Sequence, residues 1–262
     1  MSVMMTDREA AMADDDHLPD TADTDSPEAV ELISEHVDVD TWTRFTPEQK
    51  QRVRLMYNIA QQITSDTGNS FVLKGGTALM LAYGLPRYST DLDFDGKHSG
   101  VDISDSIAAG ATNAGIIGGR VNWKKNTDIT SRHMLHYPES KDAPLKVEVS
   151  YRQANQVDEA DITEIDGMRV YKIEKLAELK TAAFRNRLRA RDIFDIDFII
   201  EHYAQAVSDS DLTIIYNKVR EIGMDGLANT MRDDEILRDY DIDGIVLRLA
   251  DRVAELMSQR GL

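Results

Sequence analysis

The sequence contains no cysteine in 262 residues. Disulfide bonds, thiolate metal sites and cysteine nucleophiles are therefore excluded, and a chain without cysteine is consistent with a reducing cytoplasm. No apolar run approaches the roughly 18 residues that a membrane-spanning helix needs. The acidic N-terminus also lacks the basic start and apolar stretch of a secretory signal. We therefore expect a cytoplasmic protein with no membrane partner.

Basic residues are in the minority, but the excess of negative charge is unevenly distributed. The formal net charge is −17, and the first 40 residues carry 13 acidic side chains against a single arginine. That segment accounts for −12, which leaves −5 for the other 222 residues. A basic groove for a nucleic acid on the body of the protein is therefore not excluded.

The pattern of apolar and polar residues divides the chain into three regions. Residues 1–27 are acidic and poor in apolar side chains, which predicts a flexible tail. Residues 28–155 mix short strands with helices, and residues 156–262 are mainly helical. We therefore expect an α+β fold with a small mixed β-sheet, flanking helices and a helical C-terminal half that contributes to the functional site.

Periodicity and turn residues place the individual elements. Thr46 and Pro47 form a helix start, with an N-cap residue followed by proline. The expected helices cover 47–66, 78–83, 103–114, 173–203 and 243–257, with further helical segments in 210–260. The expected strands cover 71–73, 91–95, 121–137 and 145–151.

Two aspartates alternate with apolar residues in the expected strand 91–95. Because side chains of a strand alternate between its faces, Asp91 and Asp93 share one face, with Cα atoms roughly 6.5–7 Å apart. Two carboxylates at this spacing suit a hard divalent cation such as Mg²⁺ or Mn²⁺. An exposed acidic strand face would show the same pattern, so the pair is weak evidence when taken alone.

A glycine pair joins the strand 71–73 to the helix that follows it. Lys74, Gly75, Gly76 and Thr77 stand at this junction, where glycine lets backbone N–H groups approach an anion. Thr77 could cap the helix or offer its hydroxyl to a phosphate. An ordinary strand-to-helix turn would explain the same residues.

The strand 145–151 carries a further candidate carboxylate. Leu145, Val147 and Val149 share one face, and Lys146 and Glu148 lie on the other. If this strand neighbours Asp91 and Asp93, Glu148 becomes a third metal ligand or a base for an incoming nucleophile. A plain amphipathic surface strand is the competing interpretation.

Charged residues interrupt the apolar stripe of the expected helix 173–203. At about 100° per residue, apolar and charged side chains point to the same side of this helix. They are Ile173, Lys180, Phe184, Arg187, Arg191, Asp195 and Phe198. Charges on a buried face need partners or a function. Lys180 is placed to neutralise a triphosphate, whereas the arginines could bind phosphates or pair with Asp192 or Asp195.

These motifs together resemble a known family. The segments 74–79 and 87–94 are similar to the first motif of the AbiEii/MenT nucleotidyltransferases, which belong to the DNA polymerase β-like superfamily. Residues 146–148 resemble the strand that carries the third acidic residue, and Lys180 with 187–195 resembles the later Lys…Arg-Asp-X-X-Asp motif. The resemblance spans about 73–200 and departs from the wider superfamily at Thr77, where Gly-Ser is usual.

The resemblance implies a nucleotidyltransferase core in 28–155 and a role for each matching residue. Asp91, Asp93 and Glu148 would bind the metal, and with Lys180 and Asp192 they would form the catalytic set. The remaining matches are expected to bind the nucleotide or support its site: Lys74, Gly75, Gly76, Thr77, Arg87, Ser89, Lys180, Arg187, Arg191 and Asp195.

Members of this family are toxins of toxin–antitoxin pairs, and some add nucleotides to the 3′ end of tRNA. We therefore expect transfer of a nucleotide from NTP to RNA, such as tRNA, with a cognate antitoxin as a partner. Basic residues around Trp123 (Arg120, Lys124, Lys125 and Arg132) suit single-stranded RNA. The alternatives are a small-molecule or protein acceptor, or an inactive binding module.

Overall fold

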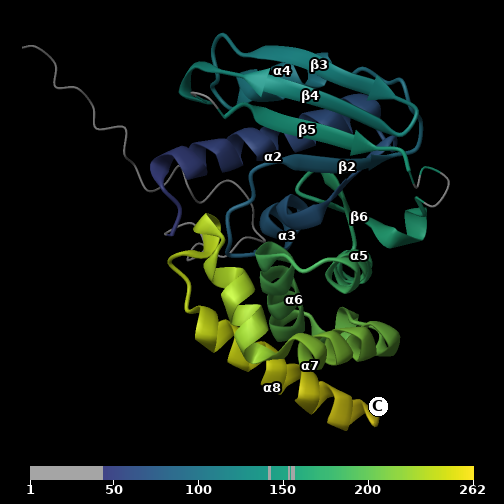
Figure 1. The fold of residues 1–262 in the computed structure, drawn as a ribbon. Coiled ribbons are helices and arrows are strands. Elements are labelled where there is room, and N and C mark those ends of the chain that lie inside the picture. The colour runs from purple at the N-terminus through teal and green to yellow at the C-terminus, as the bar shows by residue number, and fades with distance from the viewer. Residues whose placement is uncertain (1–43, 141–142, 153, 155–156) are drawn as a thin grey trace, which may run out of the picture.

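A computed structural model describes residues 44–140, 143–152, 154 and 157–262 (Figure 1). The acidic tail expected over 1–27 lies outside these residues. In the described ranges the fold is a mixed sheet with helices, followed by a helical C-terminal part, which confirms the α+β expectation.

The described strands form one seven-stranded mixed sheet in the order β3-β4-β5-β2-β1-β7-β6. Strand β2 pairs with β5 in parallel and with β1 in antiparallel orientation, so it lies at the centre of the sheet. The strands are β1 (Phe71–Lys74), β2 (Leu92–Gly96), β3 (Arg120–Thr127), β4 (Thr130–His136), β5 (Leu145–Ser150), β6 (Ile162–Ile165) and β7 (Met168–Tyr171).

Two helices, α2 (Pro47–Thr67) and α4 (Ser104–Asn113), pack against each other beside the sheet. Helix α2 begins with a complete capping box, in which Thr46 and Gln49 exchange side-chain and backbone hydrogen bonds. The two helices approach closely at Gly110, where an added Cβ would lie 2.6 Å from the Cα of Ile59. Glycine is therefore required at this crossing.

The remaining helices gather below the sheet in Figure 1. They are α3 (Gly75–Tyr83), α5 (Ile173–Asn186), α6 (Ala190–His202), α7 (Asp209–Arg232) and α8 (Ile242–Arg260). Helix α3 contacts both the sheet and α5, and it therefore connects the two parts of the molecule. The buried hydrophobic residues form one cluster that includes Leu55 of α2 and Leu249 of α8.

The structure corrects three of the expected elements. The strand expected over 121–137 is a hairpin of β3 and β4, and the helix expected over 173–203 is split into α5 and α6. Helix α3 begins at Gly75 rather than at residue 78, with Lys74 as its N-cap, so Thr77 lies inside the helix and does not cap it. The hairpin of β6 and β7, whose strands have four residues each, was not predicted.

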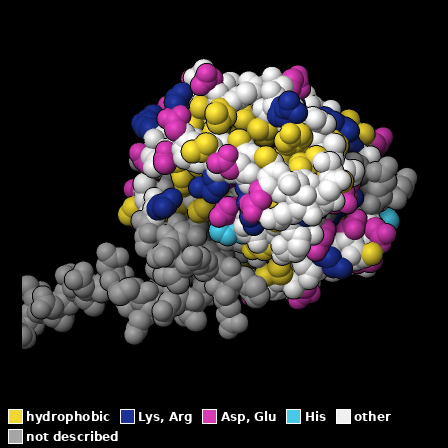
Figure 2. Space-filling model, turned by 90° about the horizontal axis from the view of Figure 1, so that it is seen from below, with side chains coloured by type: hydrophobic (Ala, Val, Ile, Leu, Met, Phe, Trp, Pro, Cys, Tyr) yellow, Lys and Arg dark blue, Asp and Glu magenta, His cyan; other side chains and the backbone are white. Residues whose placement is uncertain are grey.

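The lower face of the helical part carries charges of both signs (Figure 2). Acidic and basic side chains are interspersed there, with hydrophobic side chains exposed between them. Among the described residues, neither sign forms a continuous patch on this face, so they show no basic surface there of the kind that binds a nucleic acid backbone. None of the helices in the described ranges is both long and apolar enough to cross a membrane.

Candidate active site

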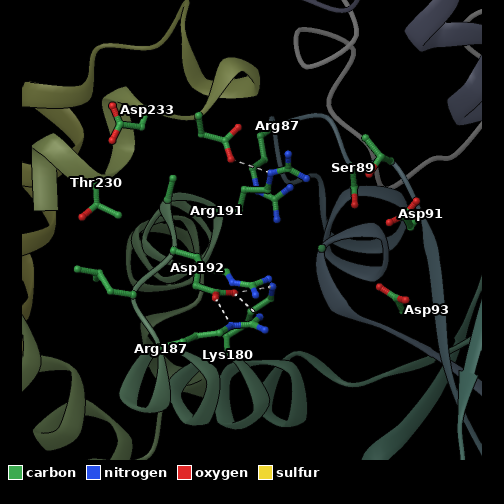
Figure 3. A pocket seen from close by; sticks show the side chains of 16 residues that line it. Arg87, Ser89, Asp91, Asp93, Lys180, Arg187, Arg191, Asp192, Thr230 and Asp233 are labelled. Atoms are coloured by element: carbon green, nitrogen blue, oxygen red, sulfur yellow. Dashed lines mark hydrogen bonds and ion pairs between the residues drawn. The ribbon is translucent and has the colours of Figure 1, made fainter. Parts of the chain in front are cut away.

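A cavity of about 580 Å³ lies between the central strand β2 and the helices α5, α6 and α7. Figure 3 shows Asp91 and Asp93 on one wall, with Lys180, Arg187, Arg191 and Asp192 opposite them. Thr230 and Asp233 of the α7 end form a further wall. The cavity thus places a pair of carboxylates on one side and a wall that carries the cations, together with Asp192, on the other, which suits a ligand that combines a metal with phosphates.

The carboxylate wall is built by β2 and β5. Asp91 immediately precedes β2 and Asp93 lies within it, and the parallel register pairs Asp93 with Glu148 of β5. Glu148 accepts hydrogen bonds from Arg132 of β4, with an Nη2–Oε2 distance of 2.6 Å, and it does not line the cavity. The strand pairing therefore brings Glu148 beside Asp93, but the carboxylate of Glu148 is paired with Arg132.

Lys146 supplies a positive charge between the two aspartates. Its Nζ lies 3.1 Å from Oδ2 of Asp91 and 4.0 Å from Oδ1 of Asp93. Partial burial raises the pKa of Asp93, Lys146 acts in the opposite direction, and the neighbouring Asp91 and Glu148 raise this pKa further. The two carboxylates therefore repel each other at a place where a cation would relieve the repulsion.

The donor set fits a magnesium ion that shares its ligands with a substrate. Within the described part of the chain, no three carboxylate or histidine side chains lie close enough together to hold a metal. Mg²⁺ is commonly bound by one or two carboxylates together with substrate phosphates, and it needs no complete protein cage. Asp91 and Asp93 meet that requirement, provided that Lys146 moves aside.

The glycine pair lies at the N-terminus of α3, next to the carboxylates. Gly75 has a φ of +77°, a conformation that glycine adopts without strain, and Asp93 lies beside it. At Gly76 an added Cβ would lie 2.5 Å from Nη2 of Arg87, so a side chain would displace this guanidinium. The α3 N-terminus has no side-chain cap, and its N–H groups therefore remain available to an anion.

Thr77 holds the loop that leads into β2. Its buried hydroxyl lies 2.8 Å from Oγ of Ser89 and donates a hydrogen bond to the backbone oxygen of Asp91. The side chain therefore contacts this loop rather than the cavity. Ser89 itself lines the cavity, as does Gly76.

The cationic wall is held together by buried aspartates. Arg87 forms a bidentate ion pair with Asp195, at 2.6 and 2.7 Å, and Lys180 lies 2.5 Å from the same carboxylate. Asp195 is fully buried; burial would raise its pKa, but Arg87 and Lys180 outweigh this effect and lower it. Asp195 does not line the cavity, so it positions the two cations and does not itself contact a ligand there.

Asp192 also contacts two cations, one of which, Lys180, it shares with Asp195. Arg187 donates a hydrogen bond of 2.8 Å to Asp192, and Lys180 lies 3.6 Å from the same residue. Arg191 pairs instead with Asp234 at 3.0 Å, a contact between the start of α6 and the segment after α7. Arg187 and Arg191 are each partly exposed, so both remain accessible from the cavity.

Most of the residues that the sequence indicated either lie on the lining of this cavity or contact a residue of that lining. The predicted residues on its lining are Gly76, Arg87, Ser89, Asp91, Asp93, Lys180, Arg187, Arg191 and Asp192. Lys74 does not line the cavity; its ammonium pairs with Asp95, which lies two positions after Asp93 on β2.

Sequence reasoning missed some residues near the site. Asp95 shares the strand face of Asp93, and Lys146 precedes Glu148 by two positions, so strand alternation could have identified both. Thr230, Asp233 and Asp234 carry no motif, because they reach the cavity only through the packing of α7.

Comparison with protein families gives a match over most of the chain. The model described as nucleotidyl transferase AbiEii toxin, Type IV TA system, matches residues 58–242, more than half of the chain and the whole of the cavity lining. A comparison with curated proteins finds no match.

Solved structures of similar fold include JHP933 from Helicobacter pylori, with 27% identity and a TM-score of 0.69 over 82% of this chain and 94% of that one. A second Helicobacter pylori structure, described as a candidate nucleotidyltransferase, has 28% identity and a TM-score of 0.68 over 82% and 97% of the two chains. MenT4, a nucleotidyltransferase toxin from Mycobacterium tuberculosis, shares the fold at 16% identity, with a TM-score of 0.50 over 87% and 89%.

The family match covers the carboxylate strand, the glycine turn and the cationic helices that form the cavity. This chain therefore belongs to the AbiEii family of nucleotidyltransferase toxins and is a nucleotidyltransferase.

Proposed function

We propose that this protein transfers a nucleotide from NTP to an RNA acceptor, such as the 3′ end of a tRNA, in a metal-dependent reaction. The observation that carries the proposal is the arrangement of charge in one cavity, with Asp91 and Asp93 facing Lys180, Arg87 and Arg187. A triphosphate with its cation matches both walls at once. As an AbiEii toxin, the protein would also have a cognate antitoxin as a partner.

In the reaction, a hydroxyl of the acceptor attacks the α-phosphorus of the NTP. The new O–P bond forms as the bond to the β-phosphate breaks, and pyrophosphate leaves. Lys180, Arg87 and Arg187 bind the phosphates and neutralise the charge that develops on them. The N-terminal N–H groups of α3 at Gly75 and Gly76 add donors to the same anion.

The carboxylates would hold the cation, and one of them would accept the proton. Asp91 and Asp93 would bind Mg²⁺ or Mn²⁺, which supplies further charge neutralisation when bound. Glu148 lies beside Asp93 in the strand register, and it would complete the carboxylate set or take the proton of the attacking hydroxyl. Either role requires Glu148 to separate from Arg132.

Exposed basic residues support an RNA acceptor. Arg189 is exposed at the cavity, and Lys124 and Lys125 are exposed on the edge strand β3. Such residues suit the phosphates of a single strand. Trp123 is stacked on His133 with ring centroids 5.3 Å apart, so its ring is already paired within the sheet.

The test is a transfer assay with labelled NTPs and Mg²⁺ on total RNA, protein and small molecules. We expect label in RNA, and a loss of about 100-fold or more in Asp93→Ala, because this variant loses a carboxylate of the cation site. Asp105→Ala, which alters an exposed aspartate of α4, is the matched control and should keep the wild-type rate.

An unchanged rate in Asp93→Ala would rule out this cavity as the active site. Label in protein or in a small molecule, with none in RNA, would replace the proposed acceptor. No transfer to any acceptor, together with no binding of NTP by calorimetry, would favour an inactive binding module.

A further inference from the structure

A second cavity, of about 680 Å³, adjoins the candidate active site. The two cavities share Thr90, whose chain neighbour Asp91 belongs to the carboxylate pair. They also meet along the segment after α7, because Asp233 and Asp234 line the first cavity and Glu235 and Ile236 line the second. A ligand in the second cavity would therefore lie next to the reacting phosphates.

Aromatic rings from separate parts of the chain line this second cavity. Tyr88 packs edge-on against Phe45, with ring centroids 5.8 Å apart, and Tyr240 packs edge-on against Phe194 at 4.9 Å. The Tyr240 hydroxyl donates a hydrogen bond to the backbone oxygen of Pro86. Both tyrosines are half-buried, so each ring is fixed by its neighbours while part of its surface faces the cavity.

The charges of this cavity do not suit a phosphate. Among its described lining residues, Arg44 is the single cation, and its guanidinium lies 5.7 Å from the centroid of the Tyr240 ring. Glu235 and Asp239 contribute exposed carboxylates. Carboxylates repel phosphates but accept hydrogen bonds from the amino groups of nucleobases, and a nucleobase stacks on aromatic or guanidinium planes.

We propose that the cavity formed by Tyr88, Tyr240 and Arg44 is a nucleobase-binding subsite of this enzyme. The inference rests on the proposed function, because it places the base next to the phosphates bound in the first cavity. Two molecules could supply the base, either the NTP or the terminal nucleotide of the acceptor RNA. The recognition chemistry is the same for both, and the experiment separates them.

The experiment compares Tyr88→Leu, which removes a ring but keeps apolar bulk, with Tyr88→Phe, which keeps the ring. Each variant is titrated with the four NTPs by calorimetry in Mg²⁺, and transfer is measured on short single-stranded RNAs that end in each of the four bases. Stacking contributes about 1–3 kcal/mol per base, so we expect Tyr88→Leu to weaken either NTP binding or acceptor binding by about 5- to 150-fold. Tyr88→Phe should stay near wild type.

Weaker NTP binding with an unchanged acceptor KM assigns the subsite to the nucleotide. A raised acceptor KM with unchanged NTP binding assigns it to the acceptor. Tyr216→Leu is the matched control, because it makes the same change in a tyrosine that is half-buried like Tyr88 but lines neither cavity. Arg44→Leu, at an exposed position, repeats the test if Tyr88→Leu does not fold.

The subsite is overturned if a folded Tyr88→Leu or Arg44→Leu protein stays within twofold of wild type in both measurements while the wild type transfers nucleotide. If the wild type transfers no nucleotide, the proposed function fails on its own. The subsite is then judged by NTP binding alone, and equal affinity in wild type and the folded variant overturns it.

Discussion

At the scale of single residues, Asp195 is the clearest case of a side chain whose role depends on burial. Its carboxylate is fully buried and contacts the guanidinium of Arg87 and the ammonium of Lys180. Without this charge the buried guanidinium of Arg87 would lose its ion-pair partner and would be repelled by the ammonium of Lys180.

We therefore expect Asp195→Asn to lower the free energy of unfolding by about 3–5 kcal/mol, the usual cost of breaking a buried ion pair. Urea denaturation followed by circular dichroism measures the change. Asp243→Asn breaks the exposed pair between Arg232 and Asp243 and should cost less than about 1 kcal/mol. Equal effects in the two variants would contradict the assigned role.

The pH dependence of stability gives a second readout of the same carboxylate. The folded-state pKa of Asp195 is lowered, so its stabilising contribution is fully present above the unfolded-state pKa of about 3.9 and is lost as the pH falls toward the folded value. We expect the difference in unfolding free energy between wild type and Asp195→Asn to shrink below about pH 4. A constant difference from pH 6 to pH 3 would contradict this explanation.

Lys146 is a residue whose importance is visible only in three dimensions. Its ammonium competes with any metal for Asp91 and Asp93. We expect Lys146→Met to bind Mg²⁺ at least about fivefold more tightly than wild type in calorimetry without nucleotide, because a repelling charge is gone. Lys124→Met, at an exposed position of β3, should leave the affinity unchanged. Weaker binding in Lys146→Met would show that the lysine organises the aspartates for the metal.

At the scale of elements, the site depends on how closely helices and strands approach one another. The crossing of α2 and α4 has room only for glycine at position 110. The split between α5 and α6 is equally important, because Lys180 of α5 meets Asp192 and Asp195 of α6 across a helix–helix contact. One straight helix over 173–203 could not fold back to make that contact.

Gly110→Ala tests the helix crossing. In an isolated helix, alanine is favoured over glycine by about 1 kcal/mol, whereas here its Cβ would clash with the backbone of Ile59. We expect a net destabilisation of about 1–3 kcal/mol, measured by chemical denaturation. The exposed substitution Ala109→Ser on the same helix should change stability by less than about 0.5 kcal/mol. A stabilised Gly110→Ala protein would refute the close packing.

At the scale of the whole molecule, the sheet and the helical part share one hydrophobic core. Tyr203 of the C-terminal part donates a hydrogen bond to the backbone oxygen of Tyr83. The hydroxyl of Tyr83 in turn donates to the backbone oxygen of Tyr171. The Arg87–Asp195 pair adds a third link between the two parts. We therefore propose that the regions 28–155 and 156–262 are parts of one cooperative unit.

We expect thermal and urea unfolding to give a single transition. In a Trp42→Phe background, Trp123 on β3 reports on the sheet by fluorescence, and far-ultraviolet circular dichroism reports mainly on the helices. Coincident curves are expected, because unfolding either part exposes the core of both. Two separate midpoints would show that the helical part folds independently.

The sequence by itself determined the local chemistry of this protein. Strand alternation placed Asp91 and Asp93 on one face, and the glycine pair marked the start of a helix, because these patterns depend on neighbours a few residues apart. It did not determine that Thr77 would hold a loop, that Arg132 would pair with Glu148, or that β6 and β7 would join the sheet.

The tertiary structure alone decided which charges meet. Arg87 and Asp195 are 108 positions apart, and Lys146 reaches the aspartates only because β5 pairs with β2 in parallel. Ion pairs and cavities depend on distances in space, and packing of the whole core sets these distances. The second cavity, formed by residues from both ends of the described chain, exists for the same reason.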